Sequence, residues 1–137
     1  MLFRSISWEQ WQKKINMLLT AKINIKFSSI ISNLSSLGLY EFYETYSKDF
    51  LIEYNVVTYP KCMQKNVLDL DSKKMIEDQW NKVDSKLKNF LIEGLQAEPL
   101  EEDRKNMGKY LQSFVGRRSD LSLDIFPKSF ISWLDLR

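Results

Sequence analysis

The chain has 137 residues and a formal net charge of +2 at pH 7, and 44% of its residues are hydrophobic and 13% aromatic. This length is typical of one domain, and the aromatic content argues against a disordered chain. We therefore expect a single globular domain spanning residues 1–137. Because 20 basic residues nearly balance 18 acidic ones, the composition argues against nucleic-acid binding, for which a strongly basic face is typical.

The sequence lacks the residues that several kinds of catalytic and metal-binding site require. The chain contains no histidine, which excludes Ser-His-Asp and Cys-His nucleophile pairs and the zinc patterns that use an imidazole. Cys62 is the only cysteine, so no disulfide can form within the chain. The four glycines are isolated and form no phosphate-binding loop. We expect a protein that is not an enzyme and that holds no metal and no cofactor.

The sequence also indicates where the protein works. Residues 1–9 lack the continuous apolar run of a signal peptide, and no stretch approaches the roughly 20 apolar residues that a transmembrane helix needs. A single cysteine is typical of a reducing compartment. We expect a cytoplasmic protein with no membrane segment.

The first part of the chain carries one clear helix signal and one ambiguous segment. Ser7 and Gln10 have capping-box spacing, and the apolar residues that follow predict a helix over about 7–20. Residues 22–27 alternate as a strand would, yet their apolar positions also fit a helix, so their structure stays undecided. For 28–37 we favour a helix, because a glycine follows it.

The next segments predict a helix, a strand and a connection. Helical spacing of apolar residues runs from Leu39 to Phe50. Residues 50–59 are rich in β-branched and aromatic side chains and favour a strand, although the helical stripe could continue through them. The connection that follows, 61–71, includes a candidate short strand at 67–70.

The clearest predicted element is a helix over 72–96, which we expect to be the longest. Its apolar stripe consists of Ile76, Trp80, Val83, Leu87, Phe90 and Leu91. Pro99 suits the first turn of a further helix, and Gly116 suits its end. Residues 121–126 alternate as a strand would, and 129–134 are apolar enough to dock on the core. The whole pattern predicts a mainly α fold of four to five helices, with at most a minor β-hairpin or short strands near 50–59 and 121–126.

Two segments are candidate partner-binding surfaces. The segment 40–59 carries five tyrosines, and tyrosine is enriched at interfaces because it joins a large ring to a hydroxyl. Packing into the core is the alternative explanation for them. The second segment is the acidic turn 98–103, whose carboxylates suit a helix N-terminus and could also meet a basic partner. The candidate residues are Tyr40, Tyr43, Tyr46, Tyr54, Tyr59, Glu98, Glu101, Glu102 and Asp103.

In its size, its composition dominated by Lys, Ile, Leu, Ser and Asn, and its lack of catalytic residues, the chain resembles the immunity proteins of bacterial toxin systems, including contact-dependent inhibition and colicin-type systems. This resemblance is one of overall character, so no residue roles are carried over. It implies a protein that binds and neutralises a cognate toxin domain, with a nuclease as one target. Since immunity proteins to basic nucleases are often acidic, this slightly basic chain would need a local acidic patch.

Two other classes of function stay open. The first is a structural or regulatory adaptor, such as a phage accessory protein, and a homo-oligomer is compatible with it. The second is a nucleic-acid-binding protein that uses the lysines on the predicted helix 72–96. Acidic residues are interleaved with those lysines, so a solvated helix face is the simpler interpretation.

Overall fold

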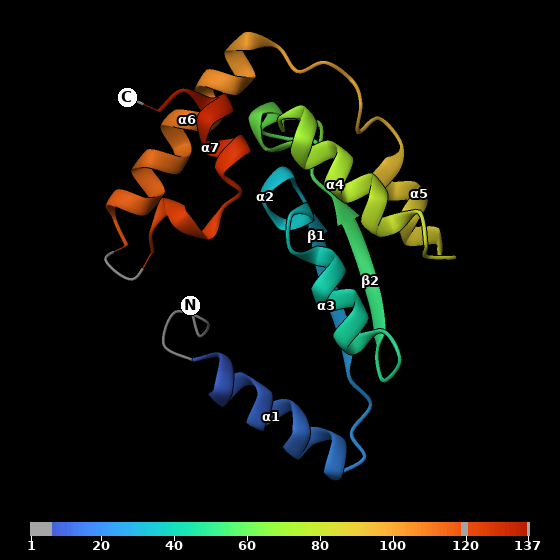
Figure 1. The fold of residues 1–137 in the computed structure, drawn as a ribbon. Helices are drawn as coiled ribbons and strands as arrows, with labels where there is room; N and C mark the ends of the chain where they lie inside the picture. The colour runs from blue at the N-terminus through green and yellow to red at the C-terminus, as the bar shows by residue number, and fades with distance from the viewer. Residues whose placement is uncertain (1–6, 119–120, 137) are drawn as a thin grey trace.

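The computed structural model describes residues 7–118 and 121–136 and shows a mainly helical fold with a small two-stranded sheet (Figure 1). The mainly α prediction is therefore confirmed. The described helices are more numerous and shorter than the four to five predicted. They are α1 (Trp8–Thr20), α2 (Asn33–Ser36), α3 (Leu39–Tyr46), α4 (Leu70–Trp80), α5 (Lys86–Ile92), α6 (Glu101–Gly116) and α7 (Lys128–Leu134), with short 3-10 helices η2 (Lys61–Met63) and η3 (Leu123–Ile125).

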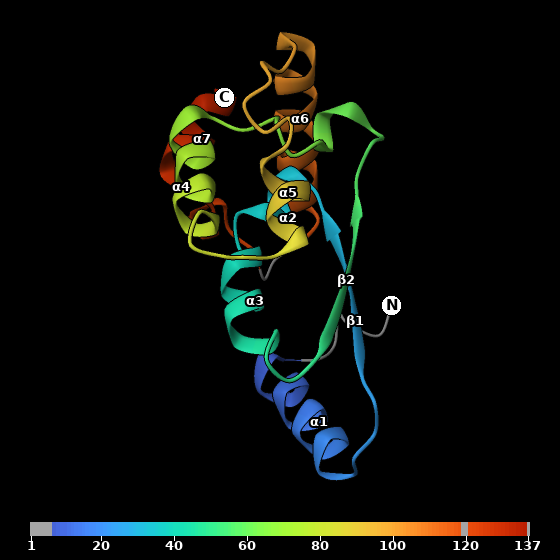
Figure 2. The same ribbon diagram turned by 90° about the vertical axis from the view of Figure 1, so that its right-hand side faces the viewer.

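The two strands, β1 (Lys26–Ile31) and β2 (Leu51–Val56), are parallel and are joined by α2 and α3. Their register places Lys26 opposite Leu51 and Ile31 opposite Val56. Alternate residues of each strand face the helices, and the others are exposed on the outer face of the sheet. Figure 2 shows α3, α4 and α5 together on one side of the two strands.

The main core is built around Trp80, which is fully buried at the end of α4. Apolar side chains from the sheet, the middle helices and the last two helices surround it. The fully buried members include Ile31, Ile76, Leu91, Leu95, Met107, Leu111 and Phe130. A second, smaller core lies between α1, α3 and the strands, and its buried residues are Ile15, Tyr46 and Phe50. The two cores bury part of the apolar stripes that the sequence periodicity indicated, and Phe90 of the predicted stripe stays 49% exposed.

Several local predictions are confirmed. At the start of α1, the Ser7 hydroxyl accepts from the Gln10 amide at 3.2 Å, and the Gln10 side chain accepts from the Ser7 amide at 3.0 Å. Helix α3 and strand β2 form where the sequence predicted them, within 39–50 and 50–59. The segment 129–134 docks as α7, in which Phe130 is fully buried.

The predicted long helix over 72–96 is wrong, because the chain leaves the helix after Trp80 and starts α5 at Lys86. The intervening residues, 81–85, are rich in Asn, Asp and Ser, which compete with the helical backbone for hydrogen bonds. Ser85 caps the new helix by accepting from the Leu87 amide at 3.2 Å. With 16 residues, α6 is the longest described helix.

The predicted helix over 28–37 is also wrong. Its first half belongs to β1, which starts at Lys26 and takes part of the undecided segment 22–27. Only the short α2 follows, and its N-cap Ser32 accepts from the Ser35 amide at 3.2 Å. The strand forms because a parallel partner, β2, pairs with it from beyond α3.

Two predicted strands are absent from the described residues. At 67–70 the chain instead enters α4, with Asp69 as its N-cap. At 121–126 it forms η3 and pairs with no strand. The helix predicted to begin at Pro99 begins two residues later, at Glu101. Within residues 7–118 and 121–136, no helix is long and apolar enough to cross a bilayer.

Candidate functional site

Of the five candidate tyrosines, one is buried, three are half-buried and one is exposed. Tyr46 is buried in the smaller core, which removes it from any partner-binding surface. Tyr40 and Tyr43 pack against Trp80, with ring centroids 5.7 and 5.1 Å from the indole. Only Tyr59, with 85% of its surface exposed, stands fully in solvent. Core packing therefore explains much of the tyrosine-rich segment.

Tyr54 lies on the inner side of β2 and is half-buried. Burial raises the pKa of its phenol to about 12. Tyr43 and Tyr54 also line a groove between β2 and α5, which is open to solvent along one side. Tyr40 differs from them, because a hydrogen bond to Glu44 raises its pKa.

The carboxylates of the acidic turn 98–103 differ in their contacts and in their exposure. Glu101 accepts a bidentate interaction from Arg104, including an Nε–Oε2 bond of 2.9 Å, which holds the pKa of that carboxyl below its ordinary value. Asp103 is half-buried near Cys62, whose pKa is raised by burial and by this carboxylate. Glu98 and Glu102 are exposed. The turn therefore offers fewer available carboxylates than its sequence suggests.

The fold brings acidic residues from other segments of the chain close to Glu98. A hollow of about 650 Å³, here called the α4–α7 hollow, lies between the start of α4, the turn at Glu98 and Pro99, and α7. Three carboxylates and one lysine line it, together with apolar and hydroxyl side chains. The charged lining residues are Asp69, Asp71, Lys73 and Glu98.

Asp69 and Lys73 form the buried floor of the α4–α7 hollow, at 5% and 2% exposure. Asp69 Oδ2 accepts from the Ser72 amide at 3.2 Å, which caps α4. Its Oδ1 is buried and has no hydrogen-bond partner among the described residues. Lys73 Nζ donates to the Ala97 carbonyl at 3.2 Å and so ties the 97–99 turn to α4. Burial lowers the pKa of Lys73, and the nearby charges of Glu98 and Asp69 oppose that shift.

Arg104 joins the acidic start of α6 to the wall of the same hollow. Its Nη1 donates to the carbonyl of Trp133 at 2.6 Å, and its guanidinium lies 5.9 Å from the centre of the Trp133 ring. Trp133 belongs to α7 and lines the hollow. Helix α6 is thereby fixed against α7.

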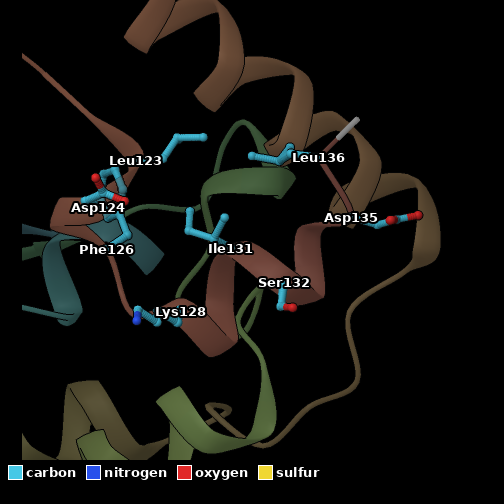
Figure 3. Close-up of a pocket in the computed structure, with 8 residues that line it drawn as sticks. All are labelled: Leu123, Asp124, Phe126, Lys128, Ile131, Ser132, Asp135 and Leu136. Atoms are coloured by element: carbon cyan, nitrogen blue, oxygen red, sulfur yellow. The ribbon is translucent and has the colours of Figure 1, made fainter.

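A second hollow of about 590 Å³, the η3–α7 hollow, shares Ser132 with the first. Figure 3 shows Leu123, Ile131 and Leu136 gathered at its centre, with Asp124 and Asp135 toward opposite ends. The two hollows together are lined by five carboxylates and two lysines, and one of those lysines is the buried Lys73. We call this surface the acidic face, and its carboxylates are Asp69, Asp71, Glu98, Asp124 and Asp135.

Three lysines of the predicted helix 72–96 lie away from the acidic face. Lys82, Lys86 and Lys88 line a third hollow, the lysine hollow, at the turn between α4 and α5, where Asp84 is the only acidic lining residue. Lys73 does not join them, because it is turned inward. The lysine face predicted for 72–96 is therefore shorter than expected. The acidic face lies at the start of α4 and the lysine hollow at its end. An 11-residue helix with about 1.5 Å of rise per residue is roughly 16 Å long.

Sequence reasoning identified only Glu98 among the five carboxylates of the acidic face. Asp69 and Asp71 precede or begin a helix, where acidic residues are common, and Asp124 and Asp135 lie near the C-terminus. None of these positions signals a shared surface before the fold is known. Within the described residues, no three His, Cys, Asp or Glu side chains are placed to hold a metal ion.

Comparisons of this chain with protein-family models, with curated proteins and with solved structures found no match.

Proposed function

We propose that this is a non-enzymatic protein that binds another protein, and that its role is that of a bacterial immunity protein which neutralises a cognate toxin domain in the cytoplasm. The observation that carries the proposal is the acidic face. A chain with a net charge of +2 places four exposed carboxylates and the buried Asp69 around two hollows that share Ser132. A nuclease needs a basic surface for its substrate, and an acidic partner is complementary to such a surface.

Apolar side chains next to the acidic face suit a protein partner better than a small ion. Leu70 is 73% exposed at the start of α4, and Leu100 is 61% exposed at the start of α6. Leu70 and Trp133 line the α4–α7 hollow itself. Interfaces combine such apolar contacts with charged rims, which speed association and fix orientation. A toxin domain held there would lose access to its nucleic-acid substrate.

The test uses two triple charge-reversal variants. The first, Asp71→Lys with Glu98→Lys and Glu102→Lys, reverses exposed carboxylates on and beside the acidic face. The matched control reverses three exposed carboxylates elsewhere, and two of them also lie in the first turn of a helix. The control substitutions are Glu9→Lys, Glu41→Lys and Asp78→Lys.

Partner proteins are captured from the source cell with the unmodified chain, and the captured protein is then purified for binding and toxicity assays. We expect the acidic-face variant to lose binding and protection while the control keeps both. Equal binding by both folded variants would contradict the proposal. A captured partner that harms no cell would favour the adaptor function instead.

The second candidate function is nucleic-acid binding, and the lysine hollow is the observation that favours it. It makes a different prediction. A mobility shift with nucleic acid at physiological salt, abolished by charge reversal at Lys82 and Lys86, would favour this function over the first.

A further inference from the structure

The second edge of β2 is open in the described structure. The Val57 amide donates to the Ile31 carbonyl at 2.9 Å. In a parallel pair, every second residue of a strand points its amide and carbonyl toward the partner strand, so this bond shows which residues of β2 face β1. By that alternation the amide and carbonyl groups of Ile52, Tyr54 and Val56 point away from β1. No hydrogen bond within the described part of the chain uses them. Exposed strand edges of this kind are ready templates for pairing with another segment.

A groove of about 470 Å³ follows this edge. Leu51 faces the outer side of the sheet and Ile52 and Tyr54 face the inner side, yet all three line the groove. The groove therefore runs along the edge of β2 from Leu51 to Tyr54, and Val56 continues that edge beyond the groove. In Figure 1, α5 lies beyond β2 on the side away from β1 and forms the other wall.

The walls of this groove are apolar and partly exposed. Leu51 and Phe90 are 66% and 49% exposed, although both are large hydrophobic residues. Tyr43 and Tyr54 add aromatic surface from α3 and β2. A two-stranded sheet buries little of its own surface and is marginal alone, so a third strand would cover side chains that water now contacts.

The charge near the groove is positive. Lys86 lines both this groove and the lysine hollow, where Lys82 and Lys88 join it. Of the acidic residues in the described chain, only Asp84 lines either hollow. An approaching segment that carries carboxylates is therefore favoured over a basic one.

We propose that the β2–α5 groove is a second binding site, which takes an extended segment of a partner protein as a third strand beside β2. The segment alternates apolar and acidic residues. Its backbone pairs with the open groups of Ile52, Tyr54 and Val56. Its apolar side chains lie against Tyr54 and Phe90, and its carboxylates lie near Lys86. In this mode main-chain bonds supply affinity and side-chain pockets supply selectivity. The site is separate from the acidic face and does not depend on the function proposed for that face.

The first test needs no identified partner. The probe is a fluorescein-labelled peptide of alternating valine and glutamate, compared with a peptide in which lysine replaces glutamate. We expect saturable binding of the acidic peptide only. We also expect slowed amide hydrogen exchange at Ile52, Tyr54 and Val56 in the complex. Absence of binding, or binding that leaves these three amides unprotected, would overturn the proposal.

Two matched substitutions isolate the backbone contribution. Val56→Ala shortens the side chain but keeps the amide, whereas Val56→Pro removes a donor that β1 does not use. We expect the alanine variant to bind the peptide and the proline variant to bind about tenfold more weakly or not at all. Equal binding by the two variants would refute strand pairing.

A charge variant covers the case in which Val56→Pro does not fold. Lys86→Glu should weaken binding of the acidic peptide about tenfold, while the control Lys74→Glu, exposed on α4, should leave it unchanged. Unchanged binding by Lys86→Glu would contradict the proposed occupant. If a single-stranded oligonucleotide displaces the peptide and binds the Val56→Pro variant equally well, the groove is a nucleic-acid site and the proposal fails. Charge reversal on the acidic face should not alter peptide binding, so the two proposals can fail separately.

Discussion

Replacing Trp80 with alanine should remove about 3–5 kcal/mol of stability. The side chain of Trp80 is 0% exposed, and it contacts Tyr40 and Tyr43 in the centre of the main core. A fully buried indole removes roughly 150–250 Å² from water, and at about 25 cal/mol per Å² this corresponds to roughly 4–6 kcal/mol. Alanine retains part of that burial, which brings the expected loss down to the range above.

A second substitution separates packing from hydrogen bonding at the same position. The indole Nε1 of Trp80 is buried and has no hydrogen-bond partner among the described residues. An unsatisfied buried donor costs about 1–3 kcal/mol. Trp80→Phe removes this donor along with part of the ring, so its cost should be less than half that of Trp80→Ala.

Urea denaturation monitored by circular dichroism measures both variants. The slope of the transition shows whether each variant unfolds in the same two-state manner. A loss below about 1 kcal/mol for Trp80→Ala would refute the burial argument. A phenylalanine variant as unstable as the alanine variant would refute the argument about the unsatisfied donor.

Two further predictions concern pH and backbone conformation. The pKa of Tyr54 is raised to about 12 in the folded state, against about 10 when unfolded, so its contribution to stability is complete below pH about 10 and is lost as pH rises toward about 12. Urea denaturation across this range should show a steeper alkaline loss for the native chain than for Tyr54→Phe, and parallel curves would contradict the assignment. Gly94 has a φ of 74°, so Gly94→Ala should cost about 1–2 kcal/mol. By contrast, Gly116→Ala, in open space at the end of α6, should gain about 0.5 kcal/mol, and thermal denaturation that ranks these two variants in the opposite order would refute the backbone argument.

The elements predicted correctly are those in which a local signal and the tertiary contacts agree. The capping box at Ser7 and Gln10 sets the start of α1 without help from distant residues. The aromatic and β-branched residues of β2 favour a strand, and β1 supplies the partner that the strand needs. In α7 the apolar run predicted docking, and burial of Phe130 confirms it.

The wrong predictions share one physical cause, which is that hydrophobic periodicity reports neither backbone breaks nor the tertiary partners that decide between helix and strand. Trp80 and Leu87 keep helical spacing across 81–85, so the stripe continues while the helix ends. The segment 28–37 fits both periods, and the decision depends on β2, which lies about 20 residues further along. The alternation at 121–126 lacks a neighbouring strand, so no ladder forms.

The candidate site was only partly predictable for a related reason. Glu98 is in a dense acidic segment and could be found from the sequence. Asp71 and Asp124 are single acids in distant segments, and they reach one face only because α4 and η3 both pack beside α7. In the other predicted surface, Tyr43 and Tyr54 lie together on a groove, whereas Tyr46 is buried. No local signal distinguishes these three tyrosines.

The central claim is that the acidic face binds a protein partner, and a hydrogen-exchange footprint of the complex with the captured partner tests it most directly. We predict slower amide exchange in the complex at the start of α4, in residues 97–104 and in α7, which together surround the α4–α7 hollow. The exchange of α1, on the smaller core, should not change. Protection confined to the 81–89 turn, or protection of α1 without α7, would contradict the claim.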